Sequence, residues 1–168
     1  DILLSDKRFR YIRHDHNKGL ASGRNSAIYA SNGKYFTFCD DDDLWKKDLV
    51  ENFLNVAEKY NDNYLFCSMV ISDFESFLAI ESSLKNFMIS GYTPPVGSQF
   101  YFTSTLKNIG GYNENIKSGV DHDLWFNLAS CNQKLVYLNK ELSMPNQVFS
   151  DKRTVSYTHL RAHETFGY

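Results

Sequence analysis

One hydrophobic run that ends in a block of acid constrains the fold of this chain more than any other feature. Residues 34–39 are mostly aromatic or β-branched (Lys-Tyr-Phe-Thr-Phe-Cys), and residues 40–43 are four consecutive aspartates. A strand that is covered on both faces has this near-continuous composition, whereas a half-exposed strand alternates apolar and polar residues. The run therefore predicts a buried strand whose carboxyl end opens abruptly at an acidic surface.

The segments on either side of this strand alternate between helical and extended patterns. Helices are expected over residues 20–30, 47–60, 104–109 and 121–129. Strands are expected over residues 9–13, 34–39, 64–70, 99–102 and 134–138. Residues 72–97 fit no single pattern and end in a proline-containing loop. Strands that alternate with helices predict an α/β layered sheet.

Composition excludes several other classes of protein. The 168 residues are 42% hydrophobic and 15% aromatic, which is enough apolar surface to offset the entropy of ordering one domain. No apolar run approaches the ~20 residues of a membrane-spanning helix. A net charge of −2 gives no electrostatic reason to expect nucleic acid as a partner. Three widely spaced cysteines fit a reducing compartment better than a disulfide framework.

Four adjacent carboxylates at the end of a buried strand are electrostatically costly, which favours a chemical role for them. Side chains alternate along a strand, so Asp40 and Asp42 are expected to point the same way. Two such carboxylates suit Mg²⁺ or Mn²⁺, which takes its remaining ligands from water and from substrate phosphates. The carboxyl edge of an open α/β sheet is also where folds of this kind bind ligands.

The acidic block has three alternative interpretations. The simplest is an acidic surface turn without chemical function. A calcium-binding EF-hand loop beginning at Asp40 would place Glu51 correctly, but Leu44 and Trp45 occupy the ligand and glycine positions. A haloacid-dehalogenase-type phosphatase also has Asp-x-Asp after an apolar strand, but it would have a small β-branched residue in place of Asp43.

Three motifs, in order, resemble the family 2 glycosyltransferases of GT-A fold. They are residues 17–25 (Asn-Lys-Gly-Leu-Ala-Ser-Gly-Arg-Asn), residues 33–45 around the four aspartates, and residues 109–114 (Ile-Gly-Gly-Tyr-Asn-Glu) followed by 121–125 (Asp-His-Asp-Leu-Trp). The resemblance implies an α/β fold, a Rossmann-like mixed sheet flanked by helices. It also implies that the family's opening strand and nucleotide-binding loop precede Asp1, so we expect a fragment truncated at its N-terminus.

The resemblance assigns residues to the donor side of a glycosyltransferase site. Asp40 and Asp42 would hold the Mg²⁺ or Mn²⁺ ion that bridges the two phosphates of a nucleotide-sugar, with Asp42 the more direct ligand. Arg24, early in a helix after a glycine turn, would hold the nucleotide or its diphosphate; an ordinary salt bridge is the alternative. The expected donor-side residues are Gly19, Arg24, Asn25, Asp40, Asp41 and Asp42.

The resemblance also assigns residues to the acceptor side. Asp121 matches the family's general base, which removes the proton of the acceptor hydroxyl in a one-step displacement that inverts the anomeric configuration. The alternative for Asp121 is a helix N-cap. Gly111, Tyr112, His122 and Trp125 are expected beside the acceptor.

The predicted function is a metal-dependent inverting glycosyltransferase. It would move a sugar from a nucleotide-sugar to a glycan or lipid-linked acceptor hydroxyl in bacterial surface polysaccharide synthesis. The family suggests the cytoplasm, at the inner face of the plasma membrane, with any peripheral membrane association made through missing regions. A non-catalytic carbohydrate-binding module of the same fold and a haloacid-dehalogenase-type phosphatase are the alternatives.

The end of the chain differs in amino-acid composition from the rest. Residues 1–153 are expected to form a partial GT-A glycosyltransferase domain. Residues 155–165 (Val-Ser-Tyr-Thr-His-Leu-Arg-Ala-His-Glu-Thr) resemble a translated transposase-type sequencing adapter. Residues 154–168 are therefore expected to be a non-native tail and are excluded from the fold.

Overall fold

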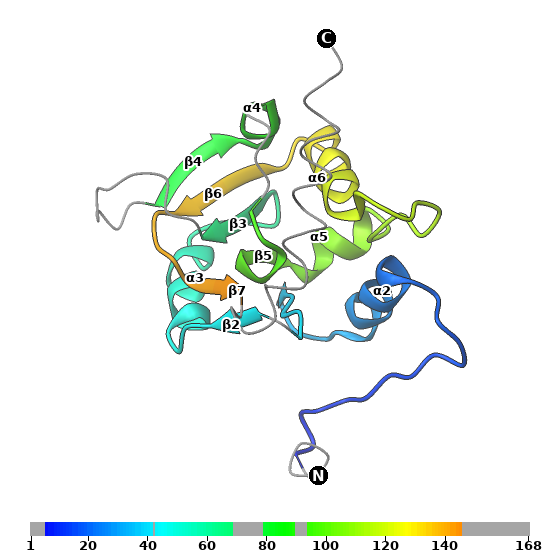
Figure 1. The fold of residues 1–168 in the computed structure, drawn as a ribbon. Coiled ribbons are helices and arrows are strands. Elements are labelled where there is room, and N and C mark those ends of the chain that lie inside the picture. The colour runs from blue at the N-terminus through cyan, green and yellow to red at the C-terminus, as the bar shows by residue number, and fades with distance from the viewer. Residues whose placement is uncertain (1–5, 42, 69–78, 90–93, 146–168) are drawn as a thin grey trace.

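A five-stranded mixed sheet forms the centre of the computed structural model, which describes residues 6–41, 43–68, 79–89 and 94–145 (Figure 1). The strand order is β1-β5-β3-β6-β4; β3 and β6 are parallel and the other neighbours are antiparallel. The strands are β1 (Tyr35–Thr37), β3 (Tyr64–Ser68), β4 (Ala79–Ser83), β5 (Gln99–Phe102) and β6 (Lys134–Leu138). The mixed α/β sheet expected from the sequence is confirmed.

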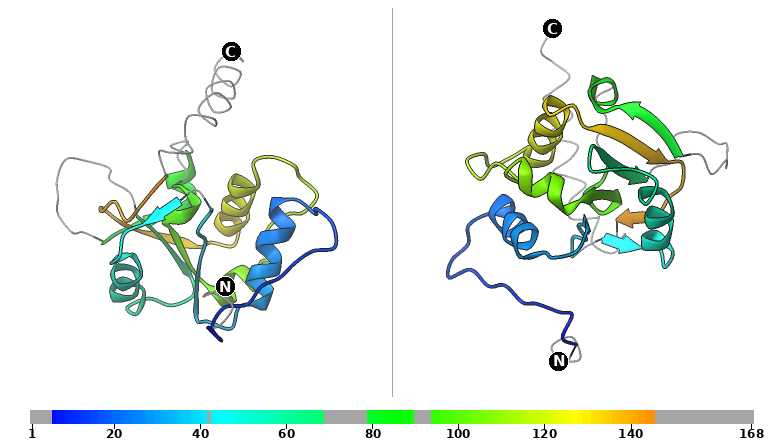
Figure 2. Two further views of the ribbon diagram at one scale, coloured as in Figure 1. Left: turned by 60° about the horizontal axis from the view of Figure 1, so that its bottom comes forward. Right: turned by 180° about the vertical axis from the view of Figure 1, so that it is seen from behind.

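Helices cover both faces of this sheet (Figure 2). Helix α3 packs on one face, and the other helices pack on the opposite face. The helices are α2 (Leu20–Ala30), α3 (Leu49–Ala57), α4 (Leu84–Ile89), α5 (Thr103–Asn108) and α6 (Val120–Ser130), with a 3-10 turn η1 at Val96–Ser98. Within the described ranges, no helix combines the length and apolarity that crossing a bilayer requires.

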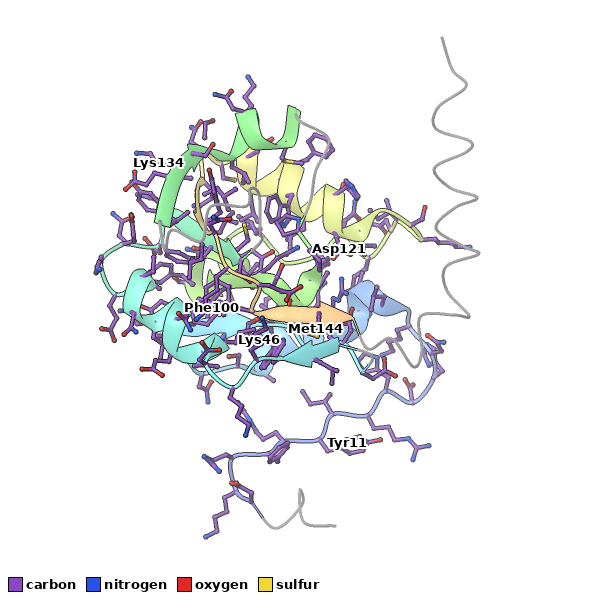
Figure 3. The ribbon with its side chains drawn as sticks, turned by 60° about the vertical axis from the view of Figure 1, so that its left-hand side comes forward. Tyr11, Lys46, Phe100, Asp121, Lys134 and Met144 are labelled. Carbon is purple, nitrogen blue, oxygen red and sulfur yellow. The ribbon has the colours of Figure 1, made fainter. Side chains whose placement is uncertain are left out.

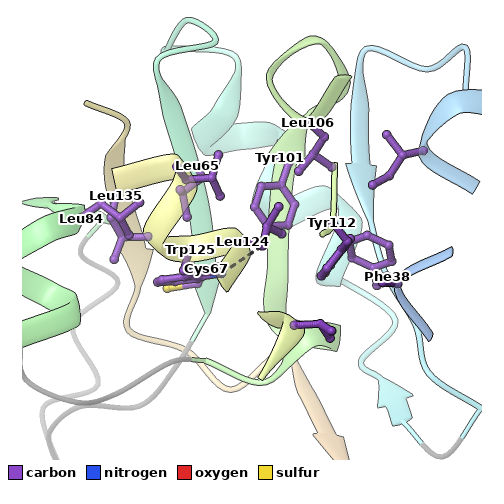
Figure 4. Packing of buried hydrophobic residues seen from close by; sticks show 14 residues of the cluster. Phe38, Leu65, Cys67, Leu84, Tyr101, Leu106, Tyr112, Leu124, Trp125 and Leu135 are labelled. Atoms are coloured by element: carbon purple, nitrogen blue, oxygen red, sulfur yellow. Dashed lines mark hydrogen bonds between the residues drawn. The ribbon is translucent and has the colours of Figure 1, made fainter. Parts of the chain in front are cut away.

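Alternation along the strands divides the core into two layers. On β5, Phe100 faces α3, where it stacks on Phe53 with ring centroids 4.9 Å apart, and its neighbour Tyr101 faces the opposite layer. In that second layer Trp125 of α6 is fully buried beside Tyr101 (Figure 4). The apolar strands β3 and β5 are therefore buried on two faces, as expected for a covered sheet. The buried strand expected over residues 34–39 is shorter and more exposed than predicted: β1 covers only Tyr35–Thr37, lies at the edge of the sheet and is half-buried.

The prediction of a strand over residues 9–13 is wrong. This segment is extended but pairs with no strand in the described part of the chain, and its Tyr11 is 78% exposed. Tyr11 lies on the long N-terminal segment that runs outside the body of the molecule (Figure 3). A segment forms a strand only when it is hydrogen-bonded to a neighbouring strand. Residues 9–13 do not pair with the edge strand β1, which is bonded to β5 alone.

Several elements were not expected from the sequence, and the first of them begins at the last aspartate of the acidic block. Strand β2 (Asp43–Trp45) pairs antiparallel with β7 (Ser143–Pro145) in a separate two-stranded sheet. In the ambiguous region 72–97 the structure shows β4, α4 and η1. The tail at residues 154–168 lies outside the described residues, so its non-native origin stays a prediction.

Candidate active site

Two of the predicted acidic residues come from segments far apart in the sequence. Asp40 follows β1 at its carboxyl end, and Asp121 lies in the first turn of α6 (Figure 3). The N-cap of α6 is Gly119, with φ 68°, so the interpretation of Asp121 as an N-cap is wrong. Its side chain is 31% exposed, which leaves the carboxylate accessible from outside.

Arg24 connects these two carboxylates. Its Nη1 donates to Oδ1 of Asp121 at 2.5 Å, and its Nη2 donates to Oδ2 of Asp40 at 3.2 Å. The Arg24 side chain is only 7% exposed. A planar guanidinium has several donors in a fixed fork, so one side chain can hold two acids in a defined arrangement. The structure thus brings Arg24, Asp40 and Asp121 together as one cluster.

Two aromatic rings lie against the guanidinium. Its central carbon is 5.4 Å from the ring centroid of Phe38 and 5.2 Å from that of Tyr112, distances at which cation–π attraction contributes. Burial by itself would lower the pKa of Arg24, but Tyr112, Asp121 and Asp40 outweigh it and the pKa lies above its usual value. Arg24 therefore stays charged at all physiological pH values.

Burial raises the pKa of the Tyr112 phenol far above its usual value, and the charge of Asp121 raises it further. The hydroxyl of Tyr112 therefore stays protonated and does not serve as a base. Tyr112 is 2% exposed, so it lies beside the cluster as part of the core. Phe38 and Tyr112 also contact each other, with centroids 5.6 Å apart (Figure 4).

Asn25, the residue after Arg24, contacts a different segment. Its Oδ1 accepts a hydrogen bond from the backbone N–H of Tyr112 at 2.7 Å, and its Nδ2 donates to the Tyr112 carbonyl at 2.9 Å. Nδ2 also donates to Oε1 of Glu114 at 2.8 Å. Gly111 approaches so closely, with φ +69°, that a Cβ there would collide with Oδ1 of Asn25. We call residues 110–114, with these contacts, the Asn25-bound loop.

The remaining predicted residues lie in different environments. Gly19 is the N-cap of α2, with φ 87°, and serves the turn that starts this helix. Asp41 and His122 are exposed, on the turn after β1 and on α6 respectively. Asp42 lies outside the described residues, so its role as a metal ligand stays a prediction.

Trp125 is fully buried in the core. Its Nε1 donates to Oε1 of Gln99 and to the hydroxyl of Tyr101, both at 3.1 Å. An acceptor could reach this indole only if the core opened. Trp125 is therefore a core residue, and a sugar acceptor bound at the surface would not touch it.

Two residues that contact the predicted ones were not among the predicted site residues. Phe38, two positions before Asp40, packs against the Arg24 guanidinium. Glu114 closes the Gly-Gly-Tyr-Asn-Glu motif and pairs with Asn25. The hydrogen bond from Asn25 lowers the pKa of Glu114, as does Ser22, so the carboxylate stays ionised at neutral pH.

The donor set is compatible with a hard divalent cation. Among the residues that the structure describes, no three His, Cys, Asp or Glu side chains are grouped to enclose a metal. Mg²⁺ rarely needs such a cage, because one or two carboxylates hold it while substrate phosphates and waters complete its shell. Asp40, with a 40% exposed side chain, can supply such an oxygen.

The fold has helices on both faces of a mixed sheet, and its acidic cluster lies at the carboxyl end of a strand, where α/β folds bind their ligands. The family model for "Glycosyl transferase family 2" matches residues 1–123. The chain therefore belongs to glycosyltransferase family 2, and the family resemblance found in the sequence is confirmed. This membership leaves the phosphatase alternative without support.

Similar proteins agree with this assignment. A Rickettsia felis protein described as an uncharacterized glycosyltransferase is 35% identical over 150 residues, which cover 84% of this chain and 24% of the relative. The Escherichia coli glucosyltransferase WfgD is 29% identical over 65 residues, 39% of this chain and 26% of the relative. The chain thus spans about a quarter of the length of these curated relatives.

The fold matches that of solved glycosyltransferases. The crystal structure of S. aureus TarS 1–349 superposes with a TM-score of 0.63 and 20% identity, covering 77% of this chain and 41% of TarS. The same protein in complex with UDP-GlcNAc gives a TM-score of 0.58 at 18% identity, over 75% of this chain and 38% of TarS. The GT-A architecture expected from the sequence is therefore confirmed.

Proposed function

We propose that this domain carries the catalytic acids of a metal-dependent inverting glycosyltransferase that uses a nucleotide-sugar donor. The observation that carries the proposal is the cluster in which Arg24 holds Asp40 and Asp121 at the carboxyl end of β1. TarS binds UDP-GlcNAc, and WfgD is named for transfer from UDP-Glc to a diphosphoundecaprenol-linked sugar. These names support a nucleotide-sugar as donor and a glycan or lipid-linked hydroxyl as acceptor.

The donor side of the site is strongly acidic. One guanidinium neutralises only one of the two carboxylates it touches, and Asp41 adds a further exposed acid. A diphosphate would be repelled by this surface without a counter-charge. We propose that Asp40 and Asp42 hold Mg²⁺ or Mn²⁺, which when bound stabilises the negative charge of the departing nucleoside diphosphate.

The acceptor side centres on Asp121. Its carboxylate would take the proton of the acceptor hydroxyl while the acceptor oxygen bonds to the anomeric carbon. The bond from that carbon to the diphosphate oxygen breaks on the opposite face, and the nucleoside diphosphate leaves with the electron pair. Arg24 fixes the carboxylate through Oδ1, so it orients the base for this transfer.

We place the reaction on the cytoplasmic side of the plasma membrane, in surface polysaccharide synthesis. The support is the lipid-linked acceptor in the name of WfgD, because a diphosphoundecaprenol anchor keeps the acceptor at a membrane face. Membrane association would then be peripheral, through the acceptor or through parts of the protein beyond the described residues.

The test uses the full-length protein with Mn²⁺ and either UDP-glucose or UDP-GlcNAc. Asp121→Asn should lower turnover by about 10²- to 10⁴-fold, as expected for loss of a general base, while UDP still binds. Asp40→Asn should weaken Mn²⁺-dependent UDP binding. Asp48→Asn is the control, because Asp48 pairs with Lys140 and is not a member of the cluster. Normal turnover of the Asp121→Asn variant would refute the assignment, and donor binding without any turnover in the wild type would favour a non-catalytic module.

A further inference from the structure

We infer that Asn25 is a positioning residue that fixes the catalytic base through the Asn25-bound loop. This inference rests on the proposed function, because it assigns Asn25 to the orientation of Asp121 instead of to the donor contact that the family resemblance implies. The observations behind it are the saturation of the Asn25 amide by protein groups and the path of contacts from that amide to Asp121.

Both donor hydrogens of the Asn25 amide, and one acceptor position of its oxygen, are used within the protein. Both N–H groups of Nδ2 are donated, to the Tyr112 carbonyl and to Glu114, and Oδ1 accepts the Tyr112 N–H. A primary amide has two donor hydrogens, so no donor remains for a ligand. Asn25 is also only 5% exposed. A nucleotide-sugar could accept a hydrogen bond from this amide only by displacing one of the two bonds that Nδ2 donates.

The contacts of Asn25 lead to the proposed base in two steps. The Asn25 amide is hydrogen-bonded to both the N–H and the carbonyl of Tyr112, which fixes the position of the Tyr112 ring. The centroid of this ring is 5.2 Å from the central carbon of the Arg24 guanidinium. Arg24 in turn holds Oδ1 of Asp121 at 2.5 Å. A shift of Tyr112 would therefore change the packing that keeps Arg24, and with it Asp121, in place.

Gly111 supports the same conclusion. Its backbone lies against Oδ1 of Asn25 with no room for a Cβ, and its φ of +69° is a region that residues with side chains rarely adopt. The backbone of the Asn25-bound loop therefore packs directly against the Asn25 amide. A loop built so closely around one side chain is expected to lose its position when that side chain is shortened.

The test compares Asn25→Ala and Asn25→Asp in the full-length protein. Asn25→Ala should raise hydrogen exchange at the Tyr112 amide by at least about tenfold, because the acceptor is lost. It should lower kcat by about 10- to 100-fold, as expected when a base is displaced by a fraction of an ångström or more. The dissociation constant of UDP with Mn²⁺ should stay within about twofold, because Asn25 does not touch the donor.

Asn25→Asp keeps an acceptor for the Tyr112 N–H, so hydrogen exchange at that amide should stay slower than in Asn25→Ala. Its new charge would face the Glu114 carboxylate and the Tyr112 carbonyl, so the loop should shift and kcat should fall as well. This variant also keeps the inference testable if Asn25→Ala fails to fold. Asn127→Ala is the matched control: Asn127 also donates to a backbone carbonyl, that of Ile109 at 3.2 Å, but it is exposed. Its kcat should equal that of the wild type.

Weaker UDP binding by Asn25→Ala, with kcat retained, would make Asn25 a donor ligand and overturn the inference. Faster exchange at Tyr112 with unchanged kcat would overturn it as well. Failure of the proposed function gives a different pattern, since the wild type, Asn127→Ala and Asp121→Asn would then share the same lack of turnover. In that case the exchange rate at Tyr112 alone decides whether Asn25 holds the loop.

Discussion

Replacing Arg24 by methionine removes the cation that Asp40 and Asp121 share and keeps most of the apolar packing of the side-chain stem. Removing one partner of a buried ion pair typically costs about 3–5 kcal/mol, because a charge is left without compensation. The two acids are 40% and 31% exposed, so water screens part of that penalty. We therefore expect Arg24→Met to lower the free energy of unfolding by about 2–3 kcal/mol.

Thermal unfolding followed by circular dichroism measures this effect. For a domain of this size each kcal/mol shifts the midpoint by roughly 2–4 °C, so the expected loss is about 5–10 °C. Arg8→Met is the matched control. Arg8 pairs with Asp6 at 2.6 Å, but its side chain is 89% exposed, and an exposed pair of this kind contributes little to stability. The midpoint of Arg8→Met should equal that of the wild type.

A double variant separates the loss of charge pairing from the loss of packing. Adding Asp121→Asn to Arg24→Met removes one of the unpaired carboxylates, so the double variant should unfold at a higher temperature than Arg24→Met alone. Equal midpoints for Arg24→Met and Arg8→Met would refute the claim that Arg24 is the electrostatic centre of the site. A double variant less stable than Arg24→Met would show that packing, and not charge, determines the loss.

Three further outcomes are expected. Gly111→Ala should lower the free energy of unfolding by about 2–3 kcal/mol, because its Cβ would clash with Asn25 and its φ is positive. Gly110→Ala, with φ +85° but open space around it, should cost only about 1 kcal/mol. Urea denaturation compares the two variants. Trp125→Phe should lower stability by about 2–3 kcal/mol, because it leaves a cavity and removes the indole donor, and calorimetry measures the loss. The folded state lowers the pKa of Glu114, so its ionised form adds stability at neutral pH that is lost as the pH falls through the lowered pKa. Glu114→Gln should therefore be less stable than the wild type at pH 7 and approach it below the usual Glu pKa of 4.5, as denaturation at a series of pH values will show.

Local patterns were sufficient for the elements that lie inside the core. The strands at residues 99–102 and 134–138 were predicted at their observed bounds, and helix 20–30 likewise. The two strands carry their pattern in their own residues, because burial on two faces dictates composition. Helix 20–30 has no apolar stripe, since it buries Ser22, Arg24 and Asn25, and its bounds followed from the turn residues on either side of it. Strand β2 could not be predicted in this way, since its partner β7 lies about a hundred residues later and only the fold brings them together.

The site shows the same division between local and non-local information. The motifs indicated Asp40, Asp121, Arg24 and Asn25 as functional, but the pairings among them depend on contacts across 97 and 87 positions of sequence. A sequence motif marks a residue without stating its partner. The resemblance therefore placed Asn25 beside the donor, whereas the structure bonds both Nδ2 and Oδ1 of Asn25 to the backbone of Tyr112.

Helix α2 explains how adjacent residues can serve two different parts of the site. Successive side chains on a helix point about 100° apart, so Arg24 can face the carboxylates while Asn25 faces the loop. Gly19 begins this helix with φ 87°, a conformation that sets where the first turn starts and therefore which residue faces which partner. An insertion of one residue between Gly19 and Arg24 would rotate both side chains by about 100° and break the contacts to Asp40, Asp121 and Tyr112 together. The start of one helix thus fixes the geometry of the acids and of the loop that supports them.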